Sequence, residues 1–139
     1  MTSPLDNLTG HSGPLVAEPV DGDEFIGLRT SGTVRLGDAS TASLALESQF
    51  DLAYNAAHAL CLAALRWHGF RAKHRYIVFQ VLPHTLGLGP EVWRILAKGH
   101  DTRNLGEYEG HLNLDERFVT DLITAVQTVA EKVNELTSP

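Results

Sequence analysis

The segment from about residue 42 to residue 68 constrains the fold of this 139-residue chain most strongly. Its apolar residues recur at steps of three and four positions, which predicts one long amphipathic α-helix. Alanine is frequent in it, which favours a helix and allows close packing of a neighbour. Gly69 follows where such a helix would end. The predicted apolar face consists of Leu46, Phe50, Ala53, Tyr54, Ala57, Leu60, Cys61, Ala64 and Leu65.

The segments on either side of this helix are predicted from weaker signals. Residues 21–24 are mostly acidic and suit the start of a first helix, whose apolar face would include Phe25 and Leu28. Residues 76–79 have the composition of a strand, but no partner strand is evident. We therefore predict a short helix there that ends near Pro83.

Two more helices are predicted in the C-terminal half. Pro90 suits the first turn of one of them. Gly99 and Gly106 lie on one face of that helix, which indicates either a close approach of another backbone or a break near Gly99. Asn113 or Asp115 can cap the last helix, which then continues to about residue 136.

These segments predict an all-α fold, an up-and-down bundle of four to five helices joined by short connections. Residues 21–139 are expected to form its single domain, because the chain is long enough for one core and shows no internal repeat. Residues 1–20 contain several prolines and glycines and show little periodicity, which predicts an extended or disordered N-terminal arm.

Composition excludes several classes of protein. No apolar stretch is long enough to span a bilayer, and we expect no signal peptide, because no basic region is followed by an apolar run. The single cysteine, Cys61, lies among apolar residues and cannot form an internal disulfide, so we expect it to be buried and the protein to be cytoplasmic. No His, Cys and carboxylate cluster has the spacing of a metal site, so neither a metal nor a cofactor is expected.

The formal net charge of −6 argues against nucleic-acid binding by the whole surface, but the charge is unevenly distributed. Residues 52–90 contain no Asp or Glu, yet they include four Arg or Lys residues and several histidines. This stretch predicts either a solvated helix end and loop, or a contact for an anionic ligand, RNA or an acidic partner. In the second case Arg71 and His74 are candidate binding residues.

The best candidate site is a polar cluster in the predicted helix that begins at Pro90. Consecutive turns of that helix carry Arg103, Asn104, Glu107 and Tyr108. Four-residue spacing places Arg103 beside Glu107. It likewise places the amide of Asn104 beside Tyr108. An arginine can bind phosphate through two parallel hydrogen bonds, and a tyrosine can stack on a base or donate a proton. The structural alternative is a simple intrahelical ion pair between Arg103 and Glu107.

Three segments together resemble the HEPN superfamily, most closely its small stand-alone members of the actinobacterial type. They are the helix Phe50-Asp51-Leu52-Ala53-Tyr54-Asn55-Ala56-Ala57-His58-Ala59-Leu60, its exit Leu65-Arg66-Trp67-His68-Gly69-Phe70-Arg71, and the segment Arg103-Asn104-Leu105-Gly106-Glu107-Tyr108. The resemblance covers roughly residues 25–136. It implies an all-α bundle that often forms a homodimer, with the motif helices facing each other across a cleft.

Many HEPN proteins are metal-independent ribonucleases or toxins, often paired with a nucleotidyltransferase antitoxin. Their motif is an arginine, a polar residue and, a few positions later, a histidine. Arg103 and Asn104 match the start of that motif. Tyr108 occupies the place expected for the histidine, and His111 follows just beyond it. Because a tyrosine is ordinarily a poor base at neutral pH, this departure favours binding over cleavage.

We therefore expect a non-catalytic binding or interaction module, a homodimer whose cleft around Arg103, Asn104 and Tyr108 holds an anion, a nucleotide or RNA. Glu107, Arg71 and His74 complete the predicted binding residues. The alternative is a metal-independent ribonuclease toxin, with Arg103 stabilising charge on the phosphate and Tyr108 or His111 transferring protons. A nucleotidyltransferase-type protein would then be the partner. A purely structural bundle is the third alternative.

Overall fold

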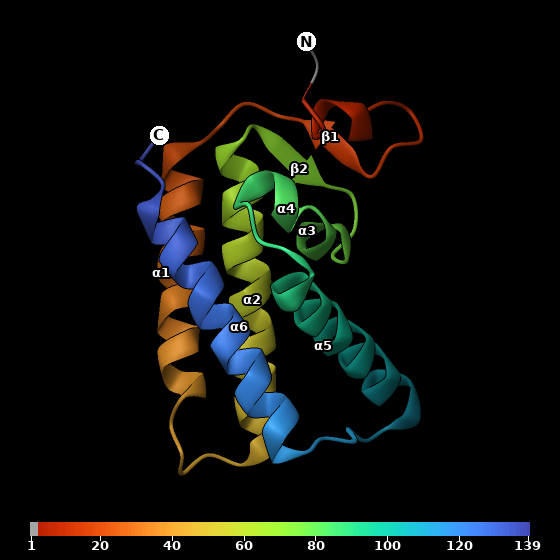
Figure 1. Ribbon diagram of the computed structural model, residues 1–139, viewed down its shortest axis with the longest axis vertical. Helices are drawn as coiled ribbons and strands as arrows, with labels where there is room; N and C mark the ends of the chain where they lie inside the picture. The colour runs from red at the N-terminus through yellow and green to blue at the C-terminus, as the bar shows by residue number, and fades with distance from the viewer. Residues whose placement is uncertain (1–2) are drawn as a thin grey trace.

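Four long helices run alternately down and up in the computed structural model, which describes residues 3–139 (Figure 1). They are α1 (Gly22–Ala39), α2 (Leu46–Trp67), α5 (Pro90–Glu109) and α6 (Glu116–Glu135). Two short helices, α3 (Ile77–Gln80) and α4 (Leu82–Thr85), lie between α2 and α5. The predicted all-α up-and-down bundle is therefore confirmed. No helix within residues 3–139 combines the length and the apolar character needed to cross a membrane.

The helix α2 forms the centre of the bundle. Both α1 and α6 pack along it, whereas α5 is inclined to these three helices, and its far end stands off from the start of α2 (Figure 1). Every residue of the predicted apolar face of α2 is buried except Leu46, which is half-buried. Small residues bring the backbones close: Gly32 of α1 lies against the side chain of Leu60. The spacing of the apolar residues therefore predicted both this helix and its buried face correctly.

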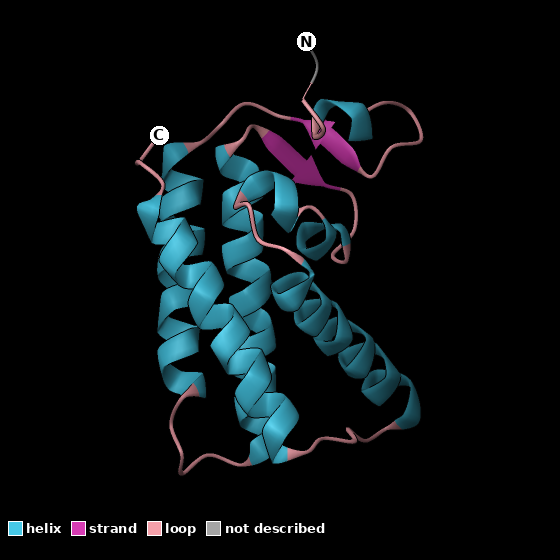
Figure 2. Cartoon of the chain, viewed as in Figure 1, coloured by secondary structure: helices cyan, strands magenta, loops and turns pink. Residues whose placement is uncertain are grey.

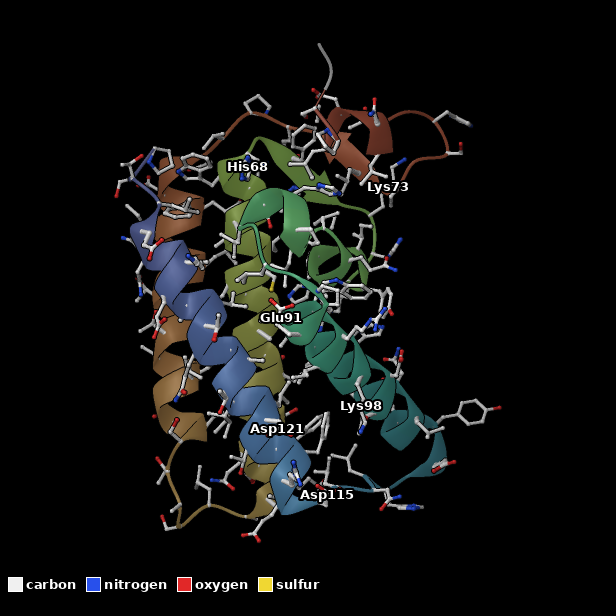
Figure 3. All side chains as sticks on the ribbon, viewed as in Figure 1. His68, Lys73, Glu91, Lys98, Asp115 and Asp121 are labelled. Carbon is white, nitrogen blue, oxygen red and sulfur yellow. The ribbon has the colours of Figure 1, made fainter. Side chains whose placement is uncertain are left out.

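The ends of the long helices follow ordinary capping chemistry. The side chain of Asp21 accepts hydrogen bonds from two backbone N–H groups in the first turn of α1. Of the two predicted caps of α6, Asp115 is the one in place, accepting from the N–H of Phe118 at 2.7 Å (Figure 3). Gly110 ends α5 with φ at +83°, a left-handed conformation that suits glycine. The alternative of a break near Gly99 is wrong, because α5 continues through it.

The N-terminal segment contains a short 3-10 helix, Asp6–Leu8, and the strand β1 (Leu15–Ala17). This strand pairs antiparallel with β2 (Phe70–Ala72), with Leu15 opposite Ala72 (Figure 2). The side chains of Leu5 and Leu15 are buried. The sequence analysis predicted no strand pair, because strands of three residues are too short to show an alternating pattern.

The predicted single helix ending near Pro83 is wrong in its extent. The chain turns at Val81 and starts a second short helix, α4, with Pro83 in its first turn. Proline is tolerated there because its missing N–H would have no partner within the helix. Residues 77–79 are all buried, so this apolar run packs into the end of the bundle and shows no strand pairing.

Candidate functional site

Two glycines set how closely the inner face of α5 approaches its neighbours. Gly99 and Gly106 are both buried. A Cβ atom at Gly99 would lie 3.3 Å from the side chain of Leu122, and one at Gly106 would collide with the side chain of Leu112. The predicted close approach of another backbone is wrong at Gly99, where only side chains lie against the glycine, and at Gly106 the nearest atoms belong to the side chain of Leu112. The polar residues of the site lie between the two glycines and just beyond them.

The side chain of His100 is hydrogen-bonded on both sides, between α2 and α5. Its Nδ1 lies 3.0 Å from the hydroxyl of Tyr54, and its Nε2 lies 2.9 Å from the amide nitrogen of Asn104. Because an amide nitrogen can only donate, Nε2 accepts, and Nδ1 carries the proton that is donated to Tyr54. Burial raises the pKa of Tyr54 above its ordinary value, against the effect of nearby Arg75, so the phenol stays protonated.

The guanidinium of Arg103 lies next to this hydrogen-bonded row. It forms the predicted ion pair with Glu107, at 3.1 Å between Nη1 and Oε1, and its Cζ stands 5.2 Å from the centre of the Tyr54 ring. Among residues 3–139, Glu107 is its one ion-pair partner. The side chain is 28% exposed, and the ion pair uses only one of its N–H-bearing nitrogens.

Two histidines near Arg103 are held in their neutral form. Burial lowers the pKa of His58 to about 4, and the charges of Arg75 and Arg103 add to this effect. Burial also lowers the pKa of His100, against an opposing effect of Asp101. Both imidazoles are therefore uncharged at pH 7. Within the described chain, Arg75 has no carboxylate partner.

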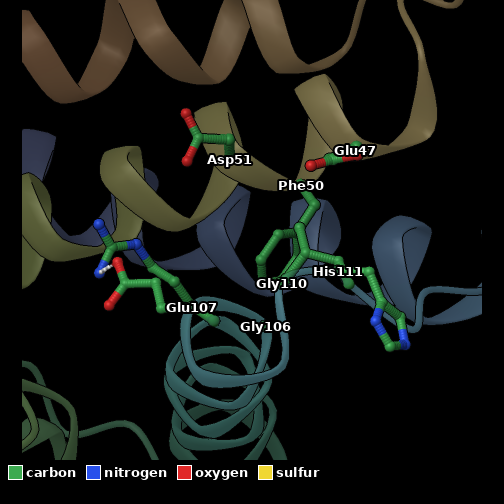
Figure 4. A pocket seen from close by; sticks show the side chains of 9 residues that line it. Glu47, Phe50, Asp51, Gly106, Glu107, Gly110 and His111 are labelled. Carbon is green, nitrogen blue, oxygen red and sulfur yellow. Dashed lines mark ion pairs between the residues drawn. The ribbon is translucent and has the colours of Figure 1, made fainter.

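On the side of Arg103 that faces away from His58 and His100, the surface is acidic. A pocket of about 330 Å³ opens there between the start of α2 and the end of α5 (Figure 4). Glu47 and Asp51 line it from α2, and Glu107 lines it from α5. These three carboxylates repel anions, so an anionic ligand would bind Arg103 from the side that faces Arg75.

The structure brings together three of the four residues in the predicted polar cluster. Arg103 pairs with Glu107 as expected, and Asn104 lies beside them. Tyr108 does not join this group, because its side chain is 93% exposed. The amide of Asn104 binds His100, one turn earlier, and not Tyr108, one turn later.

The other predicted residues lie in three different surroundings. His111 lines the acidic pocket, on the far side of Arg103 from the neutral histidines. Arg71 forms ion pairs with Glu18 at 2.7 Å and with Glu24 at 2.6 Å. His74 is exposed, and it lies close enough to His100 for its charge to lower the pKa of that group. The basic stretch therefore does approach the motif helix, through residues 74 and 75.

Four residues of this site were not predicted from the sequence: Tyr54, His58, Arg75 and His100. A signal existed for His100, which precedes Arg103 by three positions and therefore shares its helix face. Tyr54 was correctly assigned to the buried face of α2, but the partner of its hydroxyl is remote in sequence. Arg75 lies on a turn whose path over α2 has no local signature.

In residues 3–139, no group of three or more His, Cys, Asp or Glu residues is placed to hold a metal ion. Comparison with known proteins found no matching family model, no matching curated protein and no matching solved structure. The geometry around Arg103 is therefore the basis for a functional proposal.

Proposed function

We propose that this protein is a HEPN-like, non-catalytic binding module that holds a phosphate-bearing ligand, a nucleotide or RNA, where α5 meets α2. One observation carries this proposal: two incompletely paired guanidinium groups, Arg103 and Arg75, flank two uncharged histidines. Arginine suits phosphate because it donates two parallel hydrogen bonds. The exposed amide of Asn104 adds a polar group at the edge of the site.

A homodimer is part of this proposal. Two large side chains on the outer surface of α5 support it, Leu105 at 55% exposure and Tyr108 at 93% exposure. Tyr108 then contributes to a dimer contact and not to the ligand site itself. A cytoplasmic location completes the proposal, because Cys61 is a free, buried thiol. A nucleotidyltransferase-type partner belongs to the ribonuclease alternative considered below.

The dimer is tested by light scattering on the wild type and on the double variant Leu105→Ser/Tyr108→Ser. We expect a dimer for the wild type at micromolar concentration and a monomer for the variant, because serine removes the exposed apolar surface. Val34→Ser, which replaces another exposed apolar residue on α1, is the control and should stay dimeric. A monomeric wild type, or a dimeric double variant, would contradict this part of the proposal.

A second candidate function is metal-independent RNA cleavage, and the surroundings of His100 favour it specifically. Among the described residues, its Nε2 accepts a hydrogen bond from the exposed amide of Asn104 alone, so a substrate hydroxyl that displaced the amide could donate its proton there. Arg103 would stabilise the charge that develops on the phosphate. In this alternative His100 takes the role that the sequence analysis assigned to Tyr108 or His111.

Replacing Arg103 by alanine is expected to weaken binding of a labelled single-stranded RNA at least about tenfold, because a charge-assisted contact to phosphate is lost. Fluorescence anisotropy in EDTA measures the affinity. Arg103→Lys should restore it only in part, since lysine lacks the paired donors. Arg117→Ala removes an exposed cation at the start of α6 and should leave the affinity unchanged.

The same samples separate the two candidate functions. Intact RNA after incubation with the wild type supports the binding module. Cleavage by the wild type that is lost in both Arg103→Ala and His100→Ala would replace it with the ribonuclease. Equal affinity of the wild type and Arg103→Ala would contradict both functions, because both place a phosphate at that guanidinium.

A further inference from the structure

A second, smaller pocket of about 230 Å³ lies where the chain between β2 and α3 crosses α2. No carboxylate lines it within the part of the chain that the structure describes, in contrast to the acidic pocket beyond Arg103. It shares His58 and Arg75 with the site described above. The lining residues are His58, Leu62, Arg71, Ala72, Lys73, His74 and Arg75.

Two of the cations in this basic pocket are available to a ligand. Arg71 is not one of them, because its guanidinium is neutralised by two carboxylates. The ammonium group of Lys73 lies at the edge of the strand pair (Figure 3). Within residues 3–139 its hydrogen bonds go to two backbone carbonyls, those of Gly10 at 3.2 Å and His11 at 3.4 Å. Arg75 has no ion pair in residues 3–139. The pocket therefore keeps the positive charge of Lys73 and Arg75.

We propose that the basic pocket is a second phosphate subsite, and that it and the Arg103 site together hold two phosphate groups of one oligonucleotide backbone. This inference rests on the proposed function, which supplies the first phosphate. The two subsites adjoin, because the ring of Tyr76, the residue after Arg75, stands 5.1 Å from the ring of His100, and Arg75 and His58 line the basic pocket itself. An oligonucleotide has a phosphate at every linkage and can therefore occupy both subsites at once. A nucleoside monophosphate has a single phosphate and can occupy only one of them.

The size of the basic pocket supports a phosphate group as its occupant. Pockets that enclose a whole small molecule usually exceed about 300 Å³, and this one has about 230 Å³. Lysine serves as a point charge for phosphate, and Arg75 adds directed donors. The net charge of the chain is −6, so binding of a polyanion depends on such a local concentration of cations.

The experiment compares the wild type with the double variant Lys73→Gln/His74→Gln. Glutamine at position 73 removes the charge but keeps a side-chain donor close to the two carbonyls that Lys73 contacts. The matched control is Arg117→Gln/His84→Gln, which replaces one exposed cation and one exposed histidine elsewhere. The probes are a labelled ten-nucleotide single-stranded RNA, DNA of the same sequence, and uridine monophosphate.

We expect the double variant to bind the RNA about fivefold more weakly. The slope of log affinity against log salt concentration should become shallower by about 0.7, which is the change for one lost phosphate contact on a single strand. Affinity for uridine monophosphate should stay at the wild-type value. RNA and DNA should lose affinity in parallel, because both subsites contact phosphate alone. The control variant should bind every probe as the wild type does.

The outcomes distinguish the second subsite from the proposed function. Wild-type affinity of the double variant for RNA, together with weak binding by Arg103→Ala, would overturn the second subsite alone. An equal loss for RNA and uridine monophosphate would overturn it too, since a single site would then explain both. If the wild type bound none of the three probes, the proposed function and the second subsite would both fail.

Discussion

Replacing Arg66 with methionine is expected to lower the free energy of unfolding by about 3 kcal/mol, because its guanidinium is buried and surrounded by acceptors. The side chain is only 1% exposed. It donates to the backbone carbonyls of Glu18, Pro19 and Phe70 and to the carboxylate of Glu24. Methionine keeps the apolar stem of the side chain but offers no donor. The contacts that fasten the N-terminal segment to the end of α2 would therefore be lost together.

Urea unfolding measures this effect, and the melting temperature should fall by about 10 °C for a chain of this size. The matched control is Arg71→Met, which removes the other guanidinium that is paired with Glu18 and Glu24. Arg71 is 38% exposed and donates to no backbone carbonyl in the described residues, so the expected loss is below about 1 kcal/mol. Equal losses in the two variants would show that the buried carbonyls do not matter.

Acid should reduce the difference between the wild type and Arg66→Met. Hydrogen bonds from Arg66 and Arg71 lower the pKa of Glu24 from its ordinary value of 4.5. A carboxyl group with a depressed pKa stabilises the fold above the pKa of the unfolded chain, and that stability is lost as pH falls through the folded value. The advantage of the wild type should therefore begin to shrink below about pH 4.5.

The long helices could be predicted from the sequence because their signals are local. The apolar residues of α2 recur at helical spacing, and Asp21 and Asp115 stand directly at the ends that they cap. The ion pair between Arg103 and Glu107 is local as well, one helical turn apart. Each of these features involves residues that are close along the chain.

The features that could not be predicted all join remote parts of the chain. The guanidinium of Arg66 meets backbone carbonyls more than forty positions away, and the pairing of β1 with β2 fastens the same two segments. The contact between Tyr54 and His100 spans 46 positions. Nothing in the local pattern distinguishes Tyr54 from the other buried residues of α2. The site therefore emerged only when the path of each helix was known.

The neutral histidine His58 couples ligand binding to protonation. His58 lies deep enough to lose its charge, yet it adjoins both arginines that we propose for phosphate binding. An anion bound there would favour the imidazolium form, since an opposite charge nearby raises a histidine pKa. Ligand binding and protonation are therefore expected to promote each other, which makes the affinity depend on pH.

Binding of the single-stranded RNA is expected to tighten as pH falls from 7.5 to 5, by up to about tenfold per pH unit for each proton taken up. The groups that face His58 are Arg75, His100 and Arg103, with Lys73 and His74 beside it in the basic pocket. The phosphodiester keeps its charge throughout this range, so the change arises from the protein. Anisotropy titrations at constant ionic strength measure it, and an affinity independent of pH would contradict the link between phosphate and imidazole.

The stability of the free protein should change in the opposite direction to the affinity, between about pH 6.5 and 4. The unfolded chain protonates His58 below its ordinary pKa of 6.5, while the folded chain resists protonation down to about 4. The unfolded state then binds more protons, so stability falls as pH decreases from about 6.5 towards 4. In His58→Gln this loss should be smaller, and the affinity for RNA should rise less steeply towards acid. A variant that flattened only the stability profile would show that His58 is buried for packing and does not sense the ligand.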